Sequence, residues 1–217
     1  MHQEWSEQNK KMQTLLKKAS FSQGIDALLV LRETLMAQMQ GWRNTLTEAD
    51  YSSIPFLRAE GYHSKTIAYS IWHIIRIEDI VVNSLIRRRE EALFSGGFLQ
   101  KTASPIITTG NELYREAIAD FSRQLRIGAL YEYAEAVRGQ TDAWLRSIRY
   151  EDLNRRFSDE DRARLRALGV VSPDERAAWL IDYWCGKDVA GLLKMPLSRH
   201  WIMHIEAAER IKAKIKP

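Results

Sequence analysis

Two histidines in the last quarter of the chain, His200 and His204, have the spacing of a metal-binding pair. Four residues is about one turn of an α-helix, so an H-x-x-x-H pair can direct both imidazoles toward one ion. Two ligands do not complete a transition-metal site, and a third has to come from elsewhere in the chain. A solvated or capped pair is the alternative interpretation of this motif.

The third ligand is most readily supplied by another histidine, and three remain. His2 lies in a polar stretch, whereas His63 and His73 are ten residues apart, roughly 15 Å of helix, so they cannot both join one ion. We expect His73, because it lies in the middle of an apolar helix where bundle helices face one another, and we expect His63 outside the site. Taken alone, His73 could be a hydrogen-bonded core residue. Three imidazoles on core-facing helices favour a joint metal site.

Three neutral imidazoles leave one coordination position open, which is typical of catalytic rather than structural metal sites. A divalent ion held in this way lowers the pKa of bound water to about 7 or holds a thiolate in reactive form. Arg76 and Asp79 follow His73 within two helical turns and are candidates to contact a substrate anion or to orient a ligand. A simple i,i+3 ion pair between them is the alternative. Trp201 is a further candidate neighbour of the site, although its helical spacing also suits the core.

Composition limits the classes of protein to which this chain can belong. The 217 residues are 45% hydrophobic and carry a net charge of +4, with basic and acidic residues interleaved. This balance predicts a folded chain without a nucleic-acid-binding face, despite a pI near 9.2. The single cysteine, Cys185, permits no internal disulfide and is expected to be buried. With neither a signal-like amino terminus nor a membrane-length apolar run, we expect a cytoplasmic protein.

Helical periodicity dominates the chain, and alternating strand patterns are nearly absent. Ser64 is the expected N-cap of the helix that carries His73, and Ser172 with Pro173 is the expected start of a short helix. The pattern predicts a single domain over residues 1–217, an all-α four-helix bundle with long crossover connections and short extra helices. The long helices are expected at about 22–46, 65–91, 130–148 and 196–214, and the extra helical segments at 111–125, 155–168 and 172–186.

The segments TIAYSIWHIIRIEDIVVNSLI and PLSRHWIMHIEAAERI resemble the DinB/YfiT-like superfamily of metal-dependent enzymes, which is distinct from the DNA polymerase that shares the first name. The resemblance covers about residues 22–214 and implies a four-helix bundle whose second and third helices are joined by a long crossover. It implies a nickel or zinc ion held by His73, His200 and His204. The helix at 111–125 looks like an insertion relative to this family.

What the resemblance implies about activity is a thiol-dependent S-transferase or isomerase that uses a low-molecular-weight thiol, such as bacillithiol or mycothiol, on a small molecule. It also implies a homodimer. Two alternatives stay open on the residues alone. One is a metal-dependent hydrolase, and the other is a non-enzymatic bundle in which the metal is structural. Whether the metal keeps an open position that faces a pocket distinguishes the structural alternative from the two enzymes.

Overall fold

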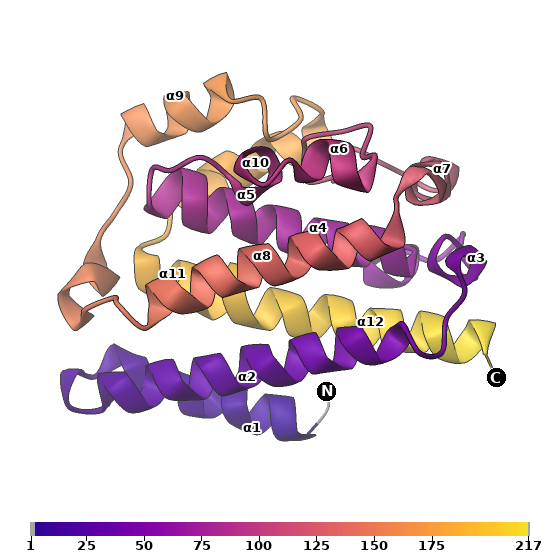
Figure 1. Ribbon diagram of the computed structural model, residues 1–217. Helices are drawn as coiled ribbons and strands as arrows, with labels where there is room; N and C mark the ends of the chain where they lie inside the picture. Colours follow the sequence, from indigo (N-terminus) through magenta and orange to yellow (C-terminus); the bar gives the residue numbers. More distant parts are fainter. Residues whose placement is uncertain (1–2, 217) are drawn as a thin grey trace.

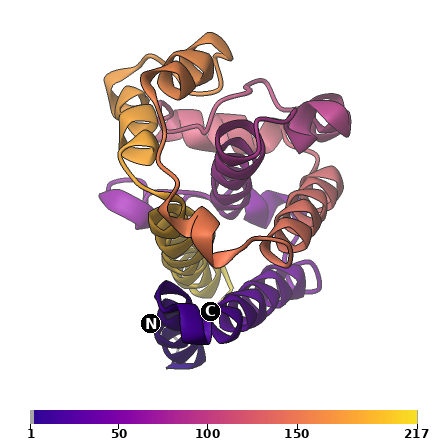
Figure 2. The same cartoon turned by 90° about the vertical axis from the view of Figure 1, so that its left-hand side faces the viewer.

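Four helices from distant parts of the sequence run side by side in the structure, a computed structural model that describes residues 3–216 (Figure 1). They are α2 (Phe21–Trp42), α4 (Ile67–Asp79), α8 (Ile127–Leu145) and α12 (His200–Ile215). Both α2 and α4 pack against α8 and α12, so the four helices enclose the core between them (Figure 2). Every regular element within residues 3–216 is helical, which confirms the predicted all-α bundle.

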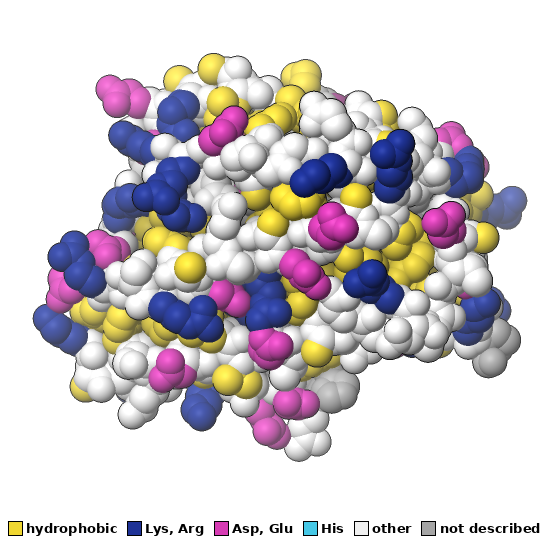
Figure 3. Space-filling view, viewed as in Figure 1, with side chains coloured by type: hydrophobic (Ala, Val, Ile, Leu, Met, Phe, Trp, Pro, Cys, Tyr) yellow, Lys and Arg dark blue, Asp and Glu magenta, His cyan; other side chains and the backbone are white. Residues whose placement is uncertain are grey.

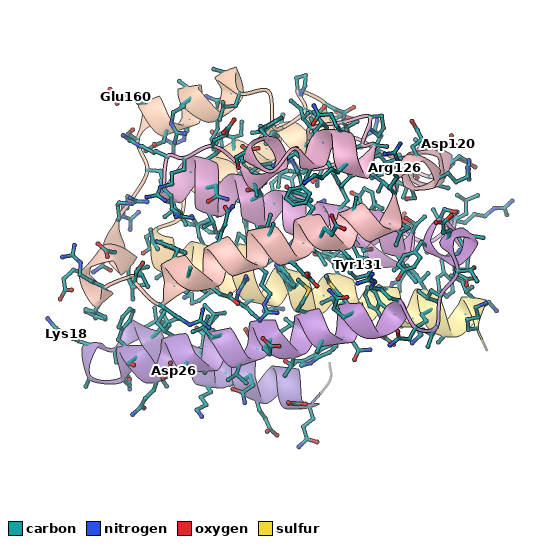
Figure 4. The ribbon with its side chains drawn as sticks, viewed as in Figure 1. Lys18, Asp26, Asp120, Arg126, Tyr131 and Glu160 are labelled. Carbon is teal, nitrogen blue, oxygen red and sulfur yellow. The ribbon has the colours of Figure 1, made fainter. Side chains whose placement is uncertain are left out.

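A buried cation joins three of these helices. Arg32 of α2 is fully buried and donates to both carboxylate oxygens of Glu78 on α4, at 2.7 and 2.8 Å, and to Asp142 on α8, at 2.7 Å. Nearby, Tyr131 of α8 points into the bundle and donates to the Met39 carbonyl of α2 (Figure 4). Because removing one partner of a buried ion pair is strongly unfavourable, these contacts fix the order of the helices around the core.

The helix that carries His73 differs at both ends from the sequence prediction. Its N-cap is Thr66, not Ser64, and the Thr66 hydroxyl accepts from the Tyr69 amide at 3.0 Å. After Asp79 the helix continues as a π-helical segment, η4 (Ile80–Ile86), and it stops there rather than at residue 91. The cause is Arg88, whose φ of 52° lies in the left-handed region and breaks the helical path.

A long connection was predicted at about residues 94–111; it is present, but it spans residues 87–115 and contains two short helices. In α5 (Ala92–Ser95) the amides of Ala92 and Leu93 donate to the Asp79 carboxylate, which therefore supports the helix start. A second short helix, α6 (Phe98–Thr102), follows. The next helix, α7 (Glu116–Gln124), begins five residues after the predicted start at 111 because Arg115 has a φ of 49°.

Smaller helices cover the ends and one side of the bundle. The predicted start of the 172–186 helix is wrong: the helix begins at Glu175, because the Asp174 carboxylate accepts from the Arg176 amide and so caps it. The predicted helix within 155–168 is present from Asp159 and is capped by Ser158. These two helices are α10 (Glu175–Cys185) and α9 (Asp159–Ala167). The remaining elements are α1 (Gln3–Lys11), η1 (Met12–Leu16), η2 (Lys18–Ser20), α3 (Glu48–Tyr51), η3 (Gly61–His63), η5 (Tyr150–Asn154), α11 (Val189–Lys194) and the π-helical η6 (Met195–Arg199).

The surface carries both signs of charge close together, as the interleaved sequence predicts. Lysines and arginines lie beside acidic side chains across the face shown in Figure 3. Lys18, Asp26, Asp120 and Glu160 point away from the bundle (Figure 4). In the described part of the chain, none of the helices combines the length and the hydropathy that a membrane span requires.

Candidate metal centre

His73, His200 and His204 converge in the core and form what we call the three-histidine cluster. His73 comes from the middle of α4, His200 is the first residue of α12, and His204 lies one turn later on the same helix. All three are buried, with exposed fractions of 3–8%. Their ring centroids are 4.6–5.1 Å apart, and one nitrogen of each ring lies within 4.8 Å of the others. The cluster can therefore hold one metal ion.

One pair of ring nitrogens, from His73 and His200, has the spacing that a shared metal requires. The Nδ1 of His73 lies 2.8 Å from the Thr109 carbonyl oxygen, which can only accept, so Nδ1 carries the proton and Nε2 keeps its lone pair. That Nε2 lies 3.2 Å from the Nε2 of His200. Two nitrogens bound tetrahedrally at 2.0–2.1 Å are separated by roughly 3.3 Å, close to this distance. Two ring nitrogens, the Nδ1 atoms of His200 and His204, are buried and have no hydrogen-bond partner within residues 3–216.

Burial keeps the cluster in the protonation state that binds metals. Desolvation lowers the pKa of His73 to about 4, although its bond to the Thr109 carbonyl acts in the opposite direction. Burial, followed by repulsion from neighbouring rings, lowers the pKa of His200 and of His204 well below the usual value near 6.5. All three imidazoles are neutral at pH 7 and can donate a lone pair to an ion.

A stretch of the crossover, which we call the 107–110 segment, is bound along one face of α4. Four side chains of α4 each donate a hydrogen bond to a different carbonyl of this segment. The bonds run from Arg76 to Ile107 (2.8 Å), from Trp72 to Thr108 (3.0 Å), from His73 to Thr109 (2.8 Å) and from Tyr69 to Gly110 (3.1 Å). The carbonyl that sets the tautomer of His73 is therefore fixed by the bonds on either side of it.

Arg76 lies beside this segment, and Asp79 lies beside Arg76 and the start of α5; no hydrogen bond joins either of them to the cluster. Arg76 is fully buried, binds Glu91, and lies 3.6 Å from Asp79, so the i,i+3 ion pair considered from the sequence is present. Asp79 also accepts from the Tyr133 hydroxyl at 2.7 Å. Arg76 and His73 are linked by the 107–110 segment, because both donate hydrogen bonds to its carbonyls. Neither Arg76 nor Asp79 lines the cavity described below.

Trp201 and His63 lie apart from the cluster. Trp201 is fully buried, with the Arg32 guanidinium 5.3 Å from its ring centroid, and it too is absent from the cavity wall. The half-buried His63 imidazole lies within 2.7 Å of an Arg210 nitrogen. His2 lies outside the described residues. Cys185 is buried, and this burial raises the pKa of its thiol, as expected for a small core residue.

A cavity of about 660 Å³ opens beside the three-histidine cluster, and all three rings form part of its wall. Tyr69 stacks on His73 with the rings 11° from parallel, and the Tyr62 ring meets His204 edge-on. We call this space the aromatic cavity because its wall also contains Tyr62, Tyr69, Tyr114, Trp179, Tyr183 and Trp184, together with Lys65 and Glu60. The sequence pattern did not mark these residues. For Tyr69 a signal existed, since it precedes His73 by four residues on the same helical face.

Comparison with known proteins supports the fold alone. No protein-family model matches this chain, and no curated protein matches it. The structure is similar to a crystal structure of a "conserved protein of locus" from Enterococcus faecalis, with a TM-score of 0.57. The alignment covers 87% of this chain and 96% of that chain, at 14% sequence identity. Similarity at this level extends to the arrangement of helices and says nothing about ligands.

Proposed function

We propose that the protein is a divalent-metal-dependent enzyme that acts on a small molecule bound in the aromatic cavity. The observation that carries the proposal is that the three-histidine cluster forms part of the cavity wall. A structural metal site is usually closed by four protein ligands, whereas a catalytic site has three and keeps a position open. A cavity of about 660 Å³ beside three ligands gives that position access to a substrate, and this favours an enzyme over a purely structural metal.

Nickel or zinc is the ion that we propose, because the resemblance to the DinB/YfiT-like superfamily implies one of the two and imidazole ligands suit both. When bound, such an ion supplies the positive charge that lowers the pKa of a water or thiol at its open position. The chain's own residues orient the site. His73 presents its Nε2 because its Nδ1 donates to Thr109, and Arg76 acts as a positioning residue through the Ile107 carbonyl. Tyr69 holds the His73 ring by stacking, while its hydroxyl donates to Gly110.

For the reaction we propose transfer involving a low-molecular-weight thiol, with membership of the DinB/YfiT-like superfamily. The support is the spacing of His73, His200 and His204 on a four-helix bundle, together with the absence of charged side chains in the ligand set. Three uncharged ligands leave the full charge of the ion to attract an anion such as a thiolate. We also propose a cytoplasmic homodimer without a nucleic-acid partner, which light scattering and a DNA-binding assay can test.

Cobalt substitution tests the thiol reaction directly. We expect a sulfur-to-cobalt charge-transfer band when a low-molecular-weight thiol is added to the cobalt-loaded protein, and no band in the His73→Ala variant. If no thiol produces the band while the spectrum of the water-bound cobalt stays unchanged, thiol transfer is rejected. Metal-assisted hydrolysis and a non-catalytic metal site would then survive, and ester and amide substrates distinguish them.

A further inference from the structure

Lys65 places a positive charge in the wall of the aromatic cavity. It directly precedes the N-cap Thr66, so the positive end of the α4 dipole lies at the same place. Its ammonium is 5.0 Å from the centroid of Tyr69, the ring that stacks on His73. Between residues 3 and 216, no carboxylate lies within ion-pairing distance of this ammonium. Lys65 is partly buried, and burial lowers its pKa, so an anion placed here would meet a partly desolvated cation.

Exposed aromatic side chains gather around the same space. Tyr62, Tyr114 and Trp179 are 37–52% exposed, among the most exposed large apolar side chains of the molecule, and all three line the cavity. Further cations lie against these rings, since Arg115 and Arg176 are within 5.8 Å of the Tyr114 ring centroid. Exposed rings that enclose a cavity offer flat apolar surface to a ligand.

Three acidic side chains lie in or near the cavity. Glu60 lines it and is exposed. Glu112, close to Tyr69, accepts from the Thr108 hydroxyl through one oxygen and keeps its second oxygen buried. Asp174 is paired with Arg176. Within residues 3–216, Lys65 is thus a cation of the cavity wall without a counter-ion, and its ammonium lies over the ring that stacks on His73.

We propose that the aromatic cavity selects amphipathic organic anions, with Lys65 binding the oxyanion group and the aromatic wall holding an apolar or aromatic body. Lys65 directly precedes the N-cap of α4, and Tyr69 and His73 lie one turn apart on that helix. The Lys65 ammonium is 5.0 Å from the Tyr69 ring centroid, which is 5.5 Å from the His73 ring centroid, so a ligand anchored at Lys65 can extend across Tyr69 to the three-histidine cluster. The inference rests on the proposed function, because this placement brings the far end of the ligand to the metal.

Two fluorescent probes test the proposal in metal-free protein. The probe 8-anilinonaphthalene-1-sulfonate and its uncharged analogue N-phenyl-1-naphthylamine share their rings and differ by the sulfonate. We expect Lys65→Met to weaken sulfonate-probe binding about five- to tenfold, with the uncharged probe unchanged within about twofold. Lys65→Arg is expected to retain the sulfonate probe. Lys101→Met is the matched control, because Lys101 also lies over an aromatic ring, Phe98, but outside the cavity.

Equal effects of Lys65→Met on both probes, or none on the sulfonate probe, would overturn the proposal. Circular dichroism checks that Lys65→Met folds, and Lys65→Gln replaces it if it does not. Because these titrations use metal-free protein, their failure leaves the metal proposal intact. Conversely, if the protein proves to bind no metal, a measured preference of the cavity for anions still stands.

Discussion

Replacing Arg76 by lysine tests whether the 107–110 segment orients His73. Lysine keeps one positive charge near Glu91 and Asp79, but it cannot also donate to the Ile107 carbonyl, which Arg76 contacts through Nε at 2.8 Å. The lost bond is charge-assisted and buried, so we expect the free energy of unfolding to fall by roughly 2–3 kcal/mol. For a chain of this size, that corresponds to a melting temperature lower by about 5–10 °C.

The same change should weaken metal binding, because the carbonyl that accepts from His73 lies two residues from Ile107. Changes to groups that orient a metal ligand typically reduce affinity about 10- to 100-fold. We expect a loss in that range for zinc, measured by competition with a fluorescent chelator. The Nδ1–H signal of His73, detected by NMR, should be sharp in the parent protein and broadened in Arg76→Lys.

Arg32→Lys is the control for this experiment. Arg32 is also fully buried and also binds two carboxylates, Glu78 and Asp142, but it does not contact the 107–110 segment. We expect a similar loss of stability with a much smaller loss of zinc affinity than in Arg76→Lys, although Arg32 also contacts the Leu197 carbonyl at 3.4 Å and the Trp201 ring on either side of His200. If both variants lose zinc affinity in proportion to their loss of stability, the 107–110 segment has no specific orienting role, and this reasoning is refuted.

Three further predictions concern stability. Metal-free protein should lose stability as the pH falls from 6.5 toward 4. The reason is that the unfolded chain binds a proton that the folded His73, with its pKa lowered to about 4, does not bind. This one group contributes roughly 3 kcal/mol to the free energy of unfolding, which a urea titration at each pH measures. Gly24→Ala should destabilise the fold by more than about 1 kcal/mol, because a Cβ there would lie 2.1 Å from the Leu15 backbone nitrogen. Gly139 has open space around it, so Gly139→Ala should be neutral or stabilising; thermal melts measure both variants. Removing metal with a chelator should leave the far-ultraviolet circular dichroism helical, because the apolar helices and not the ion hold the bundle; loss of helicity would favour a structural metal.

The sequence predicted those parts of the fold that depend on long apolar periodicity. The cores of α2, α8 and α12 lie where that periodicity placed them. The end of the His73 helix was wrong because a left-handed residue, Arg88, stops it, and a run of arginines carries no signal for that conformation. The amino-terminal helix was not foreseen, because Gln3–Lys11 is mostly polar and depends on burying Trp5.

The candidate site, like the fold, could be predicted from the sequence only in part. The convergence of His73, His200 and His204 follows from the mid-helix position of His73 on α4 and from the one-turn spacing of His200 and His204 at the start of α12. The 107–110 segment contributes backbone carbonyls, which any residue has, so no residue type marks their role. Tyr114 and Trp179 reach the aromatic cavity from a loop and from α10, and only the tertiary fold brings them to α4.

The measurement that tests the central claim most directly is the metal content of protein purified without a histidine tag. We expect about one nickel or zinc ion per chain by elemental analysis. His204→Ala should retain less than about a tenth of that, with its helical circular dichroism preserved. His63→Ala, which changes a half-buried histidine next to Arg210 and outside the cluster, should retain all of it. A parent protein that carries no metal and binds neither ion when it is added would contradict the claim. So would a His204→Ala variant that keeps its metal.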